Sequence, residues 1–190
     1  MTKKTHIPAG LVMSTAVMMQ NHGLTWEECL IGGLTAATAA TLPDADIYDG
    51  RPMNAVEDVT KIISVCFLMQ QLQGIEIDMN GLLVFVILLV LVIPLPHRGF
   101  SHSILCGSVF TEAFHYICKS EVYASWFAIS YMSHLLLDLL NKKGEPIFYP
   151  YQKKYCFRMV DAAGTANDIL CCLFCMGYAA LLAYLFYEGW

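Results

Sequence analysis

The sequence predicts an all-α fold: a multi-pass transmembrane bundle of about five to seven helices, some of them short. The first observation is composition, because 57% of the 190 residues are hydrophobic and 14% are charged, where soluble proteins carry about a quarter of charged residues. The second is that apolar runs of helical length recur along the whole chain. The third is the lack of any Pro/Ser-rich linker, low-complexity tract or repeat, which favours a single domain over residues 1–190.

The apolar runs predict seven helices in order along the chain. They span residues 8–21, 28–42, 59–73, 81–95, 103–118, 122–140 and 168–187. The run at 81–95 is almost pure Leu, Val and Ile, but at about 1.5 Å per residue it falls short of a bilayer core of about 30 Å. Only the last run is long enough to span comfortably by itself. A soluble helical protein is the alternative, although a run such as LLVFVILLVLVIPL has no polar face for water.

The charges support a topology in which all seven helices cross the membrane. The N-terminus then shares one side with loops 43–58, 96–102 and 141–167. Ten of the eleven basic residues lie on that side, and only Lys119 lies opposite: Lys3, Lys4, Arg51, Lys61, Arg98, Lys142, Lys143, Lys153, Lys154 and Arg158. The excess of Lys and Arg predicts that this side is cytoplasmic. The opposite loops are acidic, and they include Glu27, Glu28, Glu76, Asp78 and Glu121.

Several functional classes are disfavoured. A formal charge of −5 argues against a nucleic-acid-binding surface. Seven of the eight cysteines lie within apolar runs and are interpreted as small buried thiols rather than as disulfides or a zinc site. Met1 to Gly10 is followed by no small-x-small cleavage motif, so no cleaved signal peptide is expected.

The predicted topology gathers polar side chains at the cytoplasmic ends of different helices. Histidines, two aspartates of the LPDAD segment and two further aspartates make up the set: His6, Asp44, Asp46, His97, His102, His134, Asp138 and Asp168. His134 and Asp138 are four residues apart and share one helix face. His22 and His115 fall towards the opposite face and are interpreted as structural.

These side chains are candidate ligands for one or two divalent ions. Ionisable groups near a bilayer are costly unless they are neutralised, and mixed imidazole and carboxylate ligands suit Zn, Mn or Fe. Two ions would suit phosphoester hydrolysis, in which a metal pair clamps the attacking and leaving oxygens. The simpler alternatives are a hydrogen-bonded His–Asp pair and a helix-end turn at LPDAD.

The segment PHRGFSHS and the basic loop after residue 140 add candidates outside the ligand set. Arg98 could clamp an anion with its planar guanidinium, or it could simply anchor the helix at the headgroups. Ser101 could cap the following helix, and no G-x-S-x-G elbow supports a serine nucleophile. The loop NKKGEPIFYPYQKKYCFR suits the membrane interface, where it could hold anionic lipid or carry only topogenic charge.

The order of these motifs resembles the YdjM family of bacterial inner-membrane proteins, usually described as membrane-bound metal-dependent hydrolases. The resemblance rests on TH at residues 5–6, then LPDAD, HRGFSHS, SHLLLDLLNKKGEPIFYP, and FR followed by GTANDIL. It implies that the eight polar residues above are the motif positions, with Asp168 standing where an acidic residue is typical. The family often has a histidine after LPDxD, and here that position is Ile47.

Together these observations lead to the expectation of a metal-dependent hydrolase in the bacterial inner membrane, with its metal site on the cytoplasmic side. The expected substrate carries a phosphoester or other ester bond and is lipid-like and anionic, so membrane lipids are the expected partners. Arg98, Asp46 and His102 are the candidate catalytic residues. A transport protein, or a structural protein whose metal fixes the helix ends, is the alternative.

Overall fold

The computed structural model describes residues 2–21, 23–46, 53–96, 98–161 and 164–188. These ranges form seven α-helices and two short 3-10 helices, with isolated bridges but no strand. The elements are α1 Lys3–Asn21, α2 Trp26–Ala39, η1 Leu42–Asp46, α3 Met53–Gln73, α4 Met79–Val92, η2 Phe100–His102, α5 Ile104–Cys118, α6 Glu121–Leu139 and α7 Thr165–Glu188. All seven predicted helices are confirmed, and so is the all-α class.

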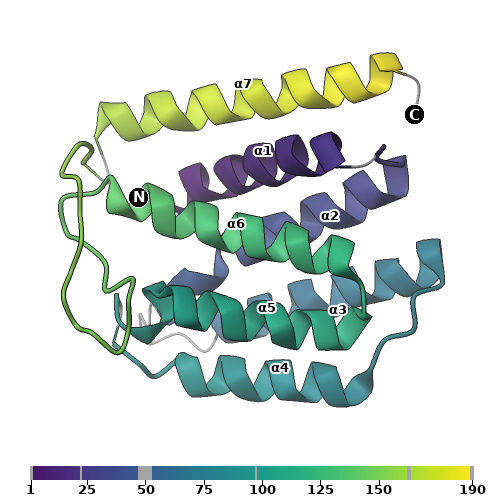
Figure 1. The fold of residues 1–190 in the computed structure, drawn as a ribbon, viewed down its shortest axis with the longest axis horizontal. Coiled ribbons are helices and arrows are strands. Elements are labelled where there is room, and N and C mark those ends of the chain that lie inside the picture. Colours follow the sequence, from purple (N-terminus) through teal and green to yellow (C-terminus); the bar gives the residue numbers. More distant parts are fainter. Residues whose placement is uncertain (1, 22, 47–52, 97, 162–163, 189–190) are drawn as a thin grey trace.

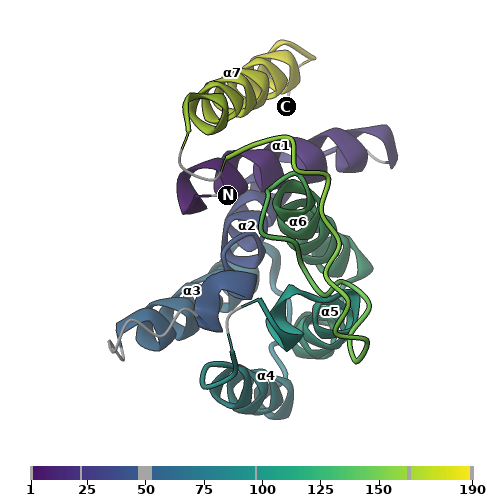
Figure 2. The ribbon, with the colours of Figure 1, turned by 90° about the vertical axis from the view of Figure 1, so that its left-hand side faces the viewer.

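The helices lie side by side, and successive helices run in opposite directions (Figure 1). One end of the bundle therefore gathers the start of α1, both 3-10 helices and the loop between α6 and α7; we call it the site end. Seen from that end, α1 lies among α7, α6 and α2, while α5 packs between α6 and α4 (Figure 2). The structure thus confirms the predicted grouping of the N-terminus with the three loops.

Close approaches between α1, α2 and α6 set the geometry of the site end. A Cβ atom on Gly32 of α2 would lie 2.3 Å from the buried ring of Trp126. A Cβ atom on Gly10 of α1 would lie 2.2 Å from the Ser130 hydroxyl, which itself donates to the carbonyl of Ala36. Small residues therefore let three helix backbones pack closely, so that polar side chains at their ends can meet.

Local signals explain where the helices begin. Thr25 and Glu28 form a reciprocal capping box at the start of α2, and Asp78 caps α4. The cap of α5 is Ser103, whose hydroxyl accepts from the backbone of Cys106 at 3.1 Å. The prediction that Ser101 caps this helix was therefore wrong, because Ser101 lies within the 3-10 turn η2, which precedes the cap of α5.

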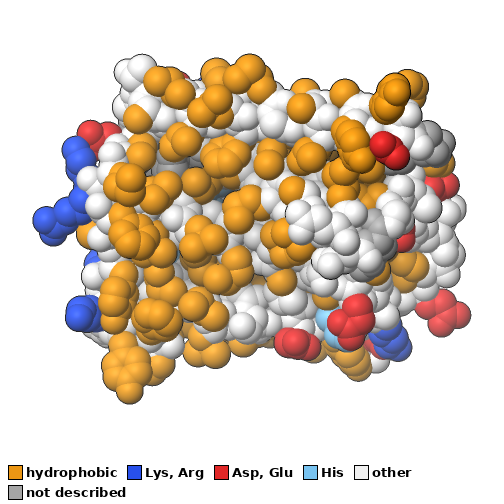
Figure 3. Space-filling view, turned by 45° about the horizontal axis from the view of Figure 1, so that its top comes forward, with side chains coloured by type: hydrophobic (Ala, Val, Ile, Leu, Met, Phe, Trp, Pro, Cys, Tyr) orange, Lys and Arg blue, Asp and Glu red, His pale blue; other side chains and the backbone are white. Residues whose placement is uncertain are grey.

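Among the described helices, α7 is long and apolar enough to cross a membrane by itself, with 24 residues. This helix packs mainly on α1. Its side chains Cys172 and Cys175 are exposed, so the prediction that these two cysteines are buried thiols was wrong. Large hydrophobic side chains cover the face shown in Figure 3, between an end with Lys and Arg on the left and an end rich in Asp and Glu on the right.

Candidate metal centre

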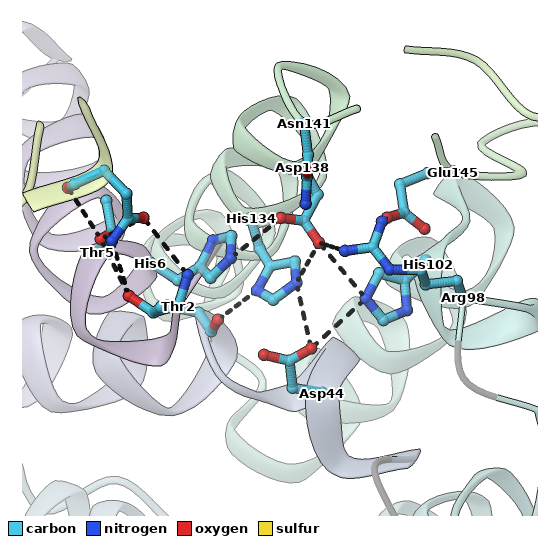
Figure 4. A network of polar contacts seen from close by, with 12 residues as sticks. Thr2, Thr5, His6, Asp44, Arg98, His102, His134, Asp138, Asn141 and Glu145 are labelled. Carbon is cyan, nitrogen blue, oxygen red and sulfur yellow. Dashed lines mark hydrogen bonds and ion pairs between the residues drawn. The ribbon is translucent and has the colours of Figure 1, made fainter. Parts of the chain in front are cut away.

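Five buried polar side chains from four elements converge at the site end (Figure 4). They come from the first turns of α1, from η1, from η2 and from the last turns of α6. Their exposed fractions range from 0 to 5%, and they are His6, Asp44, His102, His134 and Asp138. We call these five residues the cluster.

The carboxylates of the cluster bridge its three imidazoles. Asp138 Oδ1 lies 3.3 Å from His6 Nε2. Its Oδ2 lies 3.8 Å from the Nε2 atoms of both His102 and His134. Asp44 Oδ1 approaches the same two Nε2 atoms, at 3.6 and 3.8 Å. The two aspartates therefore face a shared space between the rings.

The far sides of two rings are held by hydrogen bonds. His134 Nδ1 lies 2.7 Å from the carbonyl oxygen of Ala40, and since a carbonyl can only accept, Nδ1 carries the proton and Nε2 offers its lone pair to the cluster. His102 Nδ1 contacts the Ser101 hydroxyl at 3.0 Å, so its Nε2 also points inward. Such contacts on the outer nitrogen orient histidine ligands in metal sites.

The spacing of the donor atoms suits a divalent ion. Two ligands of a zinc ion, each about 2.0–2.1 Å from the metal, lie about 3.3 Å apart in a tetrahedral site, and the distances above run from 3.3 to 3.8 Å. His6 Nδ1, His6 Nε2 and His134 Nε2 are buried and have no hydrogen-bond partner among the described residues. The spacing of these buried ring nitrogens and carboxylates is therefore compatible with binding a metal ion.

Three overlapping groups of ligand atoms meet this requirement within the described residues. In each group the ligand atoms lie within 4.8 Å of one another. The groups are His6, His134 and Asp138; Asp44, His102 and His134; and His102, Asp138 and Glu145. The first and third groups share only Asp138, whose two carboxylate oxygens can bind two ions, whereas a histidine shared between groups can serve only one.

The electrostatics of Asp44 reflect its surroundings. Burial alone raises the pKa of a carboxyl group, but the hydrogen bond to His102 and the charge that His134 and His102 can carry outweigh this effect. The pKa of Asp44 therefore lies well below its usual range, and the group stays an anionic ligand at neutral pH.

Arg98 and Glu145 extend the cluster on one side. The guanidinium of Arg98 pairs with Glu145, and its Nη2 lies 3.4 Å from Asp138 Oδ2. Arg98 adopts a left-handed backbone conformation with φ +59°, which is uncommon outside glycine and recurs at functional sites. The side chain was expected to clamp an anion or anchor the helix, and in the structure it holds two carboxylates of the protein.

Sequence reasoning missed Glu145. This residue lies in the loop between α6 and α7, where its backbone exchanges hydrogen bonds of 2.9 and 3.0 Å with Tyr155. The bridge folds the loop back over the bundle end and buries the Glu145 carboxylate. The segment GEP within a basic loop was its one signal, and it was interpreted only as part of a membrane-interface sequence.

His6 is held in place from α7. Thr5 Oγ1 donates to Asn167 Oδ1 at 3.0 Å, and Asn167 Nδ2 donates to Thr2 Oγ1 at 3.1 Å. These bonds hold the first turn of α1, on which His6 lies. Asn167 therefore supports the centre without contacting it.

The remaining predicted residues have different outcomes. Asp168 is exposed at the start of α7 and belongs to none of the three groups. His97 and His22 lie outside the described residues, as do Ile47 and the side chain of Asp46. His115 lies at the opposite end, 3.9 Å from Glu121, as its structural interpretation requires.

Comparison with known proteins identifies the family of the chain. The model of the YdjM inner membrane protein family matches residues 1–189. The chain belongs to the YdjM inner membrane protein family. No curated protein and no solved structure matches it. Membership of YdjM places the chain among inner-membrane proteins, and the buried groups above are its possible metal ligands.

Proposed function

We propose that this chain is a membrane-embedded, metal-dependent hydrolase that cleaves a phosphoester or other ester bond of a lipid-like, membrane-associated substrate. The observation that carries the proposal is the cluster itself. Buried imidazole and carboxylate donors face a shared space, at the mutual distances that one or two divalent ions require. Zn, Mn or Fe is the proposed metal, because these ions accept mixed nitrogen and oxygen ligands.

The proposed chemistry divides between the metal and the protein. A divalent ion bound here would polarise the ester and lower the pKa of water. His6, His134 and the two aspartates would hold the ion or ions. Asp46 and His102 are the candidate groups for moving the proton of the attacking water, and Arg98 would steady the anionic part of the substrate.

The proposal includes a multi-pass arrangement in the inner membrane. Support comes from the alternating helices and from exposed hydrophobic side chains on helices at opposite sides of the bundle, such as Phe67 of α3, Leu91 of α4 and Phe186 of α7, at 59, 61 and 80%. Water would disfavour such a surface, whereas lipid would not. By the positive-inside rule, the basic loops support a cytoplasmic location of the site end.

The first experiment measures metal content. Detergent-solubilised wild-type protein should carry about one or two equivalents of metal by mass spectrometry, and His134→Ala and Asp138→Ala should lose most of it because both residues lie in two of the three ligand groups. His115→Ala is the matched control, since this histidine lies outside the cluster. Equal metal content in all four proteins would sink the proposed centre.

The second experiment tests hydrolysis. Metal-loaded wild-type protein is assayed with bis-p-nitrophenyl phosphate and with p-nitrophenyl butyrate, before and after chelation. We expect turnover of at least one ester that chelation abolishes and that Asp138→Asn lacks. A loaded protein that cleaves neither ester would contradict the hydrolase.

A structural role for the metal is the second candidate, and the depth of the cluster favours it. His6, His102 and His134 each have 0% exposure, and structural metal sites are typically closed, whereas catalytic sites keep a position for water. A structural metal predicts that chelation unfolds the protein while no ester is cleaved. A transport role, the other alternative, would need polar residues along a path to the opposite end.

A further inference from the structure

A cavity of about 370 Å³ opens at the site end, beside the cluster. We call it the Arg98 cavity. Six of its lining residues carry the argument: Leu95, Pro96, Arg98, Phe100, Tyr149 and Lys154. Its volume falls within the range of small-molecule sites, about 300–1,000 Å³.

Arg98 connects this cavity to the cluster. It lines the cavity and at the same time contacts Asp138 and Glu145. Its side chain retains 13% exposure, whereas those of Asp138 and Glu145 retain 2% and 0%. A ligand in the cavity can therefore meet the guanidinium from the side opposite the carboxylates, within one side chain of the candidate metal ligands.

The lining has two kinds of surface. Arg98 and Lys154 supply positive charge, and none of the described residues that line the cavity is acidic. Phe100 and Tyr149 meet edge to face with ring centres 5.3 Å apart, and Leu95 and Pro96 extend this apolar wall. The cavity therefore suits a molecule with an anionic group joined to a hydrocarbon part.

The place of the cavity in the bundle indicates where such a molecule comes from. Leu95 and Pro96 lie three and four residues beyond the end of α4, whose side chains Leu83, Val90 and Leu91 are exposed at 58, 58 and 61%. A lipid lying along α4 would bring its headgroup to the end of that helix, where the cavity opens. Free phosphate would gain nothing from the apolar wall.

We propose that the Arg98 cavity binds the phosphate-bearing end of a membrane lipid, with Arg98 and Lys154 on the phosphate and Phe100 and Tyr149 against its first carbons. The inference rests on the proposed function and narrows its substrate class to lipid phosphoesters. Lys154 is a binding residue in this assignment and has no contact with the cluster.

The test is a binding measurement on the solubilised, metal-loaded protein by titration calorimetry. The probe is a dihexanoyl phosphonate analogue of phosphatidic acid, whose carbon–phosphorus bond resists hydrolysis. Dihexanoylglycerol and inorganic phosphate are the comparison ligands. The variants are Lys154→Ala and Lys153→Ala, which remove the same charge from adjacent positions of one loop; Lys153 lies over the Tyr155 ring at 5.5 Å and does not line the cavity.

We expect Lys154→Ala to weaken binding of the phosphonate about tenfold, the effect of losing one charge-assisted hydrogen bond. Lys153→Ala should stay within about twofold of wild type, since it contributes only long-range charge. Both comparison ligands should bind at least about tenfold more weakly than the phosphonate. Matching unfolding temperatures of the two variants would show that both are folded.

Equal weakening by both lysine variants, or equal affinity for either comparison ligand, would overturn the inference. Its failure is distinguishable from that of the proposed function. A protein that binds the phosphonate selectively but cleaves no ester keeps the lipid site and loses the hydrolase. A protein that cleaves p-nitrophenyl butyrate but does not bind the phosphonate loses the lipid site alone.

Discussion

Ser101 illustrates how a residue outside the three ligand groups can tune the centre. Its hydroxyl contacts His102 Nδ1 at 3.0 Å, and the Tyr131 hydroxyl donates to its backbone carbonyl. We predict that Ser101→Ala weakens metal binding about 10- to 100-fold, the usual effect of removing an outer partner of a histidine ligand. Competition with a fluorescent zinc chelator measures the change. Ser108→Ala on α5, at an exposed position, is the control, and equal affinities in both variants would contradict the role.

Arg98 and a divalent ion offer two ways of neutralising the same carboxylates. In metal-free protein Arg98→Ala leaves Asp138 and Glu145 without this cation, and breaking a buried pair costs about 3–5 kcal/mol. We predict a lower unfolding temperature for the metal-free variant and a larger rise on adding zinc than in wild type. Differential scanning fluorimetry with and without chelator measures both quantities. If zinc raises the unfolding temperature of Arg98→Ala no more than that of wild type, the ion and the guanidinium do not neutralise the same carboxylates.

Residue spacing predicted part of the cluster and missed the rest for physical reasons. His134 and Asp138 were predictable because four residues make one helical turn. Asp168 is exposed because its neighbour Asn167 takes the inward position on α7 and bonds Thr2 and Thr5; adjacent helical residues face directions about 100° apart. Glu145 depends on an irregular loop that pairs with Tyr155, and no sequence period encodes such a bridge.

At the scale of elements, α7 and α1 are joined at the site end by Asn167. Replacing Asn167 with Ala leaves the Thr5 hydroxyl without its 3.0 Å acceptor. The hydroxyl then keeps its longer contact of 3.5 Å with the backbone carbonyl at position 167, and losing a hydrogen bond costs about 0.5–1.5 kcal/mol. We therefore predict that Asn167→Ala lowers the unfolding temperature by a few degrees and also weakens metal binding through His6. Thr165→Ala, two residues earlier at an exposed position of α7, is the control. Lower stability with unchanged metal affinity would show that α7 does not position His6.

At the opposite end, Asp78 caps α4 and makes stability depend on pH. Backbone N–H groups of Gly81 and Asn80 and the Lys119 ammonium lower the pKa of its carboxyl group. The pKa of Asp78 is therefore lower in the folded protein than in the unfolded chain, where it is about 3.9. Its contribution to the free energy of unfolding is fully present above about pH 3.9 and is lost as pH falls through the folded-state pKa. We predict that the difference in unfolding temperature between wild type and Asp78→Asn narrows as pH falls from 6 to 3. A difference independent of pH would contradict this.

Helices were easier to predict than their ends. The apolar runs identified all seven, yet α1 begins at Lys3 and α3 at Met53, five and six residues before the runs at 8–21 and 59–73. Polar residues extend both helices because backbone hydrogen bonding continues beyond the apolar stripe. A helix-end turn at LPDAD was only an alternative in the sequence analysis, and the structure forms η1 there. The turn η2, which carries His102, was not predicted, since short 3-10 turns are too brief to show a period.

For the whole molecule, the alternating helices explain why charge and chemistry coincide at one end. Because successive helices run in opposite directions, the chain returns to the site end after α2, α4 and α6. Those returns deliver Asp44, His102 and the pair His134 and Asp138 to the same place as His6. The same returns carry the basic loops, so the topology that assembles the cluster also produces the asymmetry of charge.

This coincidence makes the orientation in the membrane testable. If the site end faces the cytoplasm, alkaline phosphatase fused after Lys142 stays in the cytoplasm and is inactive, whereas fusion after Lys119 delivers it to the periplasm and gives activity. Green fluorescent protein at the same two positions should give the opposite result, which controls for expression. Activity at both positions or at neither would contradict a seven-span bundle. Activity after Lys142 alone would invert it, and the cluster would then face a compartment with different metals and substrates.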